Sequence, residues 1–214
     1  METDLRPNEG ENNLLDTILY QRTEKFSVRM AIKAGLAVAC VVLAILIPQL
    51  VHLIAGQNSG VKWMPMFFPI LLAGCLFGYW WGLGIGAVSP IVSFLITSIW
   101  KKPMPSKYRL GFMVPEAAAF GLVSGLFSTR IAFNKWFAFP AVLFAQLIGI
   151  VLYIIICAIF QSVAHVPIGT IWNQVQAGMI GVFIQAIIVP VIVILITYLI
   201  KHEVGKGSKI EAIP

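Results

Sequence analysis

One acidic residue, Glu116, is the side chain in this sequence best suited to bind a polar ligand. It stands near the start of an apolar segment, VPEAAAFGLVSGLF, that has the composition of a membrane-spanning stretch. A carboxylate in such a place is costly to bury, so it usually has a function or a cationic partner. Two compatible interpretations stay open. Glu116 either pairs with the basic loop before it or with a helix N-terminus, or it contacts a substrate.

Aromatic and polar side chains gather at or near the ends of the apolar segments. Tryptophan and tyrosine are enriched at both membrane interfaces, so an aromatic belt is one interpretation. The other is the wall of a small-molecule pocket, because such pockets are mostly apolar with a few placed polar groups. On that interpretation we predict a substrate-binding set of Trp63, Trp100, Lys101, Tyr108, Glu116, Trp172, Asn173 and Gln176. Gln146 and Gln185 lie deep in apolar segments, where hydrogen bonds between helices are expected.

Small residues recur four positions apart in nearly every apolar segment. This spacing puts them on one helix face, where two backbones can approach closely, so packing inside a bundle is the expectation for most of them. The stripe formed by Ala31, Gly35 and Ala39 differs because it begins beside a cluster of basic residues. It can pack inside the bundle or receive helices of another membrane protein, and both interpretations stay open.

Several catalytic signatures are absent from the sequence. It has no glycine-rich phosphate loop followed by Lys and Ser or Thr, no HExxH and no GxSxG. We therefore expect no nucleotide hydrolysis by this chain alone and no enzymatic activity. Cys40, Cys75 and Cys157 each lie in an apolar run without paired spacing, and we interpret them as small buried hydrophobic residues. No metal ion or cofactor is expected.

The composition requires a membrane setting for these residues. Hydrophobic residues make up 59% of the chain and charged residues 11%, whereas soluble domains carry about 25% charged residues. The apolar runs are continuous rather than alternating, which argues against a β-barrel. At about 20 residues per span, 214 residues leave room for six helices. We predict an all-α membrane protein, a compact six-helix transmembrane bundle with spans at 28–54, 63–80, 83–100, 114–127, 137–160 and 175–200.

The region 63–127 organises this prediction. Its spans are short and interrupted by glycine and proline, and the sequence YWWG between two of them reads as a tight turn. Short, broken spans near a polar residue are where transporters tend to build substrate sites.

The distribution of basic residues predicts the topology. With six spans and an N-terminus inside, the cytoplasmic side holds ten Lys and Arg residues and the outer side five. This agrees with the positive-inside rule. The net charge of +6 is therefore explained by membrane topology, without nucleic-acid binding. Residues 1–26 lack the pattern of a signal peptide and form a cytoplasmic segment, in which 14–26 is either a short amphipathic helix or disordered. Residues 27–201 form the membrane domain and 202–214 a cytoplasmic tail.

The run MPMFFPILLAGCLFGYWWGLGIGAVSPIVSFLITS, the run PEAAAFGLVSGLF and the small-residue stripe in 28–54 resemble one family. They are similar to the substrate-binding S components of energy-coupling factor (ECF) vitamin transporters. The resemblance covers roughly residues 61–127, with weaker agreement over 28–200. It implies a bundle that captures a vitamin or precursor outside and docks on a transmembrane coupling subunit driven by two ATPase subunits. The family's Ala-x-x-x-Ala docking stripe would correspond to Ala31, Gly35 and Ala39, with glycine replacing one alanine.

The resemblance thus implies an S component in the plasma membrane of a prokaryote, with both termini in the cytoplasm. Its substrate would bind near the outer face under the loops 55–62, 101–113 and 161–174. The alternative is a self-sufficient small channel or a structural membrane protein without an ATPase partner. The position of the stripe separates the two: a self-sufficient protein would bury it inside the bundle.

Overall fold

The computed structural model describes residues 15, 19, 26–56, 59–99, 105–164 and 168–210, which are helical apart from short connections. Among these residues there is no strand, in agreement with the predicted all-α class. The helices are α2 (Phe26–Ala55), α3 (Ser59–Trp63), α4 (Phe67–Phe77), α5 (Tyr79–Ile99), α6 (Lys107–Leu126), α7 (Ser128–Phe133), η1 (Lys135–Phe137), α8 (Ala138–Ala164) and α9 (Ile168–Ile210).

Four stretches of the described helices are long and apolar enough to cross a membrane. They are α2, α5, residues 135–159 around α8, and residues 175–199 within α9. Helix α4 is apolar but shorter. Because continuous apolar helices of this length satisfy their own backbone groups in lipid, the fold is that of a membrane protein.

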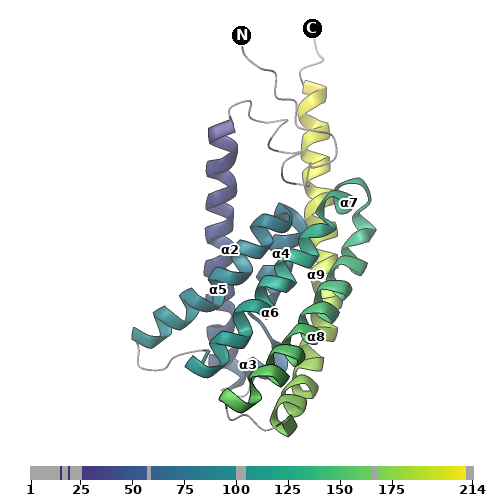
Figure 1. The fold of residues 1–214 in the computed structure, drawn as a ribbon. Helices are drawn as coiled ribbons and strands as arrows, with labels where there is room; N and C mark the ends of the chain where they lie inside the picture. The colour runs from purple at the N-terminus through teal and green to yellow at the C-terminus, as the bar shows by residue number, and fades with distance from the viewer. Residues whose placement is uncertain are drawn as a thin grey trace, which may run out of the picture.

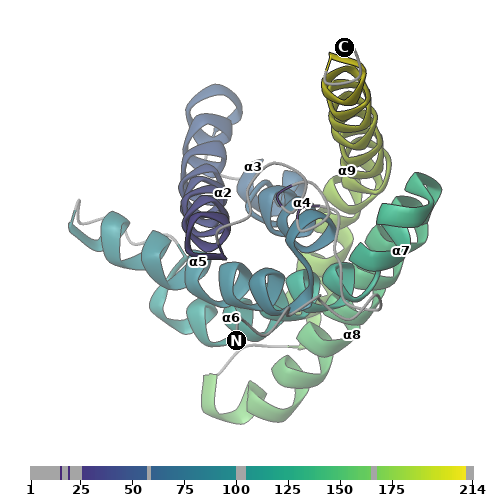
Figure 2. The same ribbon diagram turned by 90° about the horizontal axis from the view of Figure 1, so that it is seen from above.

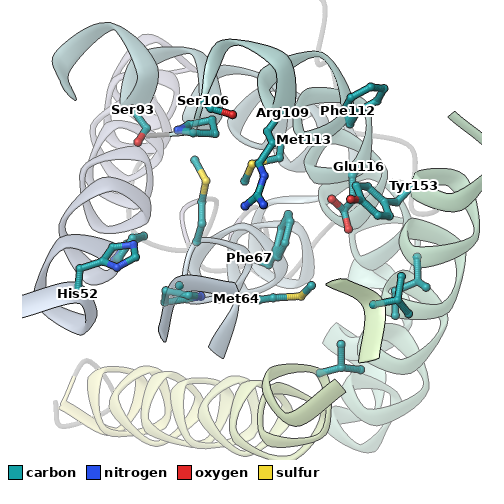
Figure 3. Close-up of a pocket in the computed structure, with 18 of the residues that line it drawn as sticks. His52, Met64, Phe67, Ser93, Ser106, Arg109, Phe112, Met113, Glu116 and Tyr153 are labelled. Atoms are coloured by element: carbon teal, nitrogen blue, oxygen red, sulfur yellow. The ribbon is translucent and has the colours of Figure 1, made fainter. Parts of the chain in front are cut away.

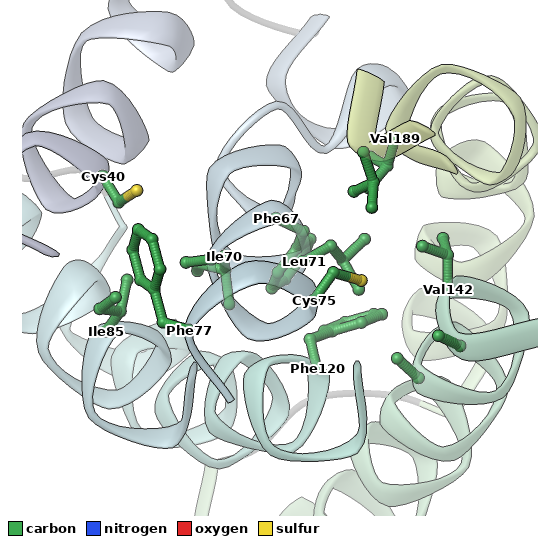
Figure 4. Packing of buried hydrophobic residues seen from close by; sticks show 14 of the residues in the cluster. Cys40, Phe67, Ile70, Leu71, Cys75, Phe77, Ile85, Phe120, Val142 and Val189 are labelled. Carbon is green, nitrogen blue, oxygen red and sulfur yellow. The ribbon is translucent and has the colours of Figure 1, made fainter. Parts of the chain in front are cut away.

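The short helix α4 is the centre of the molecule. It contacts α2, α5, α6, α8 and α9, and Figure 2 shows it inside the ring of the longer helices. Its side chains Ile70, Leu71 and Cys75 are fully buried. Figure 4 shows them facing residues of the surrounding helices, among them Phe120 of α6 and Val142 of α8. A helix with apolar residues on all sides is expected in just such a central position.

Close backbone contact joins α4, α5 and α6. A Cβ atom on Gly82 or on Gly121 would collide with the backbone of the other residue, and one on Gly86 would collide with the Ala117 carbonyl oxygen. Gly125 meets the backbone of Tyr79 in the same way. In this region the small residues therefore serve packing inside the bundle, as predicted.

Several predicted boundaries differ from the structure. The span predicted at 63–80 is interrupted, because the chain turns at Met64–Met66 and α4 covers only 67–77. The tight turn is made by Gly78, whose φ of 92° favours glycine, while the sequence YWWG forms the first turn of α5. Helix α9 extends beyond the predicted span at both ends.

Helix α6 begins at Lys107, well before the predicted start at 114, and continues through Pro115. Glu116 therefore lies in the middle of a helix, and the interpretation that it stabilises a helix N-terminus is wrong. The predicted loop 101–113 is helical from 107 onward, because Lys, Arg, Leu and Met are good helix formers.

Of residues 1–25 the structure describes only Leu15 and Leu19. Both are helical; Leu19 is buried and Leu15 packs against the core. The rest of the predicted amphipathic or disordered segment lies outside the described residues. Cys40, Cys75 and Cys157 are all buried, as predicted.

Candidate functional site

A cavity of about 490 Å³ lies among α2, the α3–α4 turn, α5, α6, α8 and α9 (Figure 3). Its volume is in the range that holds a small organic ligand. Its lining includes His52, from the C-terminal part of α2, and Arg109, from the first turn of α6. The start of α2 and the end of α9 lie at the opposite end of the molecule (Figure 1).

Helix α6 presents a row of side chains to the cavity. Phe112, Met113 and Glu116 follow Arg109 at three, four and seven residues, and all four line the cavity. This spacing places them on a single helix face. Arg109 is exposed near the N-terminus of the helix, whereas Glu116 is only 4% exposed. The row thus leads from a cation at the accessible end to a carboxyl group in the interior.

Glu116 occupies a special position in the sequence as well as in the cavity. It is the only acidic residue between positions 25 and 202. Tyr153 of α8 lies beside it and is close enough to interact with it electrostatically (Figure 3). A carboxyl group and a phenol hydroxyl side by side in an apolar wall form a polar patch that can accept hydrogen bonds from a ligand.

The α3–α4 turn forms another wall of the cavity and is fixed by α9. Met64 adopts a φ of 44°, which is uncommon for a residue other than glycine. The Gln185 side-chain amide donates to the carbonyl oxygens of Met64, at 2.8 Å, and Trp63, at 3.1 Å. Gly181 leaves no room for a side chain against the backbone of Trp63. The close approach and the two hydrogen bonds together hold the turn in this conformation.

A second glutamine joins the helices behind the cavity. Gln146 of α8 is 2% exposed, and its Nε2 donates to the Val182 carbonyl oxygen of α9 at 3.0 Å. Val182 and Ile150 line the cavity on this side. The predicted hydrogen bonds between helices are therefore confirmed for both Gln146 and Gln185.

The predicted substrate-binding residues are distributed unevenly around the cavity. Glu116 lines it directly. Trp63 precedes the lining residue Met64 but is not itself in the described lining, and it is 43% exposed. Trp172, Asn173 and Gln176 are exposed on α9 and do not contribute to the described lining. Trp100 and Lys101 lie outside the described residues, and for Tyr108 only the backbone is described.

Met64, Phe67 and Tyr153 line the cavity and are not predicted from the sequence. Arg109, which also lines it, belongs to the basic loop that the sequence offers as a partner for Glu116 or for an anionic ligand, and it precedes Glu116 by seven residues, which is two helical turns. The predicted loops 55–62 and 101–113 do supply lining residues: Gly60 from the first, and Pro105, Ser106, Arg109, Phe112 and Met113 from the second. The side chains of loop 161–174 are largely outside the described part of the chain.

The stripe on α2 forms a second candidate site. Ala31, Gly35 and Ala39 are all exposed, and a Cβ atom on Gly35 would meet no atom within 4 Å. The buried residues of the helix are Lys33, Ala37, Cys40, Ala44 and Ile45, of which Ala37, Cys40 and Ala44 belong to the hydrophobic core. At 3.6 residues per turn, Ala37 and Ala44 lie roughly 180–200° around the helix from Gly35. The small-residue face is thus directly opposite the face that packs on the bundle.

No family model matches the chain, and no curated protein or solved structure matches it either.

Proposed function

We propose that this protein is the substrate-binding S component of an ECF-type importer in the plasma membrane of a prokaryote. In this proposal α2, α4, α5, α6, α8 and α9 are the six transmembrane helices, and both termini are cytoplasmic. The protein captures a vitamin-like molecule from outside and docks on a transmembrane coupling subunit that carries two ATPase subunits. It has no catalytic activity of its own.

The observation that carries the proposal is the exposed stripe Ala31, Gly35 and Ala39 on α2. A protein that works alone gains nothing from small side chains on a lipid-facing surface, because they bury little area. Small residues allow the backbone of another helix to approach closely. Their position opposite the core face therefore favours a helical membrane partner over a self-sufficient channel.

The cavity supports the same proposal. It lies at the end of the molecule away from the start of α2 and the end of α9, which is the outer end if both termini are cytoplasmic (Figure 1). Its apolar lining with few polar groups suits a small organic molecule rather than a stream of ions.

Affinity purification from the native membrane tests this function. We expect the tagged protein, extracted in mild detergent, to bring down one polytopic membrane protein and ATPase subunits with phosphate-loop motifs. The protein purified alone should not hydrolyse ATP, because it lacks the motif that positions the phosphates. Repeated purification without any ATPase subunit would favour the self-sufficient channel instead.

A further inference from the structure

The cavity is lined by one basic and one acidic side chain at different depths. Both belong to α6, and the seven residues from Arg109 to Glu116 correspond to a rise of about 10 Å along the helix. The exposed Arg109 lies toward the outer end, and its guanidinium group points into the cavity in Figure 3. The buried Glu116 lies two turns further in, beside Tyr153. His52 is the other titratable side chain in the described lining.

The wall between these two side chains is apolar. Phe112 and Met113 occupy the intermediate positions of the row, and Met64 and Phe67 line the cavity from the α3–α4 turn and α4. Thioether side chains adapt to irregular shapes and make favourable contacts with aromatic rings. A flat apolar group fits this middle section better than a chain of hydroxyl groups does.

We infer that the ligand is a bifunctional molecule with a flat apolar body, which enters with a protonated amine or another N–H donor toward Glu116 and leaves a carboxylate or similar anion at Arg109. This inference rests on the proposed function and names the substrate class for its binding site. The inferred ligand class is based on one face of α6, which has a buried acid at the inner end, an accessible guanidinium at the outer end and apolar side chains between them.

The two ends contribute unequally to binding. A carboxyl group in a poorly solvated place gains strongly from a donor that replaces water, whereas a charge pair at an accessible mouth is screened by solvent. Removing the amine from the ligand should therefore cost more affinity than removing the acid. A molecule that carries only an anion would leave Glu116 facing its apolar body.

Three matched probes test this inference on the purified full-length protein: para-(aminoethyl)benzoate, para-ethylbenzoate, which lacks the amine, and para-methylphenethylamine, which lacks the acid. Titration calorimetry should give the tightest binding for the bifunctional probe. We expect para-ethylbenzoate to bind at least about tenfold more weakly than the bifunctional probe. The affinity of para-methylphenethylamine should be reduced by a smaller factor. Equal affinity of either monofunctional probe and the bifunctional one would overturn the inference, as would no binding of any probe.

Two variants assign the ends of the ligand. Glu116→Gln should remove the advantage of para-(aminoethyl)benzoate over para-ethylbenzoate while leaving the affinity for para-ethylbenzoate nearly unchanged. Arg109→Gln should weaken both benzoates and spare para-methylphenethylamine. Arg130→Gln, an exposed site in α7, is the control for loss of a positive charge. Unchanged probe preferences in both variants would contradict the inference. If a variant does not fold, the comparison of the three probes on the unmodified protein still tests it.

The outcome is separable from that of the proposed function. If the bifunctional probe binds as described but no ATPase subunit co-purifies, the ligand class stands and the importer is wrong. If ATPase subunits co-purify but the probes show no such preference, the importer stands and the ligand class is wrong.

Discussion

Gly82 and Gly121 determine how closely α5 and α6 can approach. Each occupies a position at which a Cβ atom would collide with the backbone of the other residue. Neither collision can be relieved by a change of rotamer, since backbone rather than a flexible side chain is in the way. The helices would have to separate, and with them α4, which packs against both.

We expect Gly121→Ala to destabilise the protein by about 1–3 kcal/mol, the usual cost of overpacking a core. Thermal unfolding in detergent, followed by circular dichroism, would measure the change. Gly84→Ala is the matched control, because a Cβ atom there meets nothing within 4 Å and the residue lies on the adjoining helix α5. A midpoint for Gly121→Ala no lower than that of Gly84→Ala would contradict the packing described for α5 and α6.

The α3–α4 turn depends on a helix far away in the sequence. Gln185 of α9 donates to two successive carbonyl oxygens of the turn, and the residues that follow line the cavity. The shape of this cavity wall is therefore set by α9 as much as by the turn itself.

We expect Gln185→Leu to lower the free energy of unfolding by about 1–3 kcal/mol, because it leaves two carbonyl groups without their donor in a poorly solvated place. The same variant should weaken binding of para-(aminoethyl)benzoate, since Met64 and Phe67 would no longer be held in position. Gln176→Leu, at an exposed position on the same helix, is the control for the unfolding measurement. A loss in the free energy of unfolding equal to that of the control would mean that Gln185 does not fix the turn.

The helices were easier to predict from the sequence than the cavity. Long apolar runs define α2, α5, α8 and the middle of α9, because continuous hydrophobicity over about 20 residues is a strong signal. The start of α6 is not predicted, because KYRLGFM contains two cations and a glycine and has the composition of a loop. The sequence offers Arg109 as a loop partner of Glu116, whereas the longer helix puts both residues on one helix face.

The contacts between residues that are distant in the chain have no comparable signal in the sequence. The sequence indicates that Gln146 and Gln185 bond to other helices, but not which carbonyl groups they reach, because the partners are backbone atoms present at every residue. The division of small-residue stripes into packed and exposed ones was likewise open until the bundle was known. Gly82 and Gly35 occur in similar patterns, and only the fold shows that the first is buried and the second is not.

The proposed topology places the first turn of α6 outside and the connection between α7 and η1 inside. Ser106 and Asn134 are exposed at these two places, and the native cysteines are all buried. We expect Ser106→Cys to react with a membrane-impermeant maleimide on intact cells. Asn134→Cys should react only after the cells are permeabilised. Labelling in the reverse order would invert the proposed orientation and place the cavity on the cytoplasmic side.

We propose that the small-residue face of α2 docks on an ATPase-driven partner, and Gly35→Trp tests this proposal most directly. Gly35 is exposed and a Cβ atom there meets no atom within 4 Å, so we expect the variant to fold and unfold like the unmodified chain. It should nevertheless prevent close approach of a partner helix. Gly111→Trp makes the same change at another open position, near the outer end of α6.

The measurement is the amount of ATPase subunit that co-purifies from native membranes with each form of the protein. We predict that the unmodified protein and Gly111→Trp retain the subunits and that Gly35→Trp loses them. Equal recovery with Gly35→Trp, or no ATPase subunit with any form, would contradict the account.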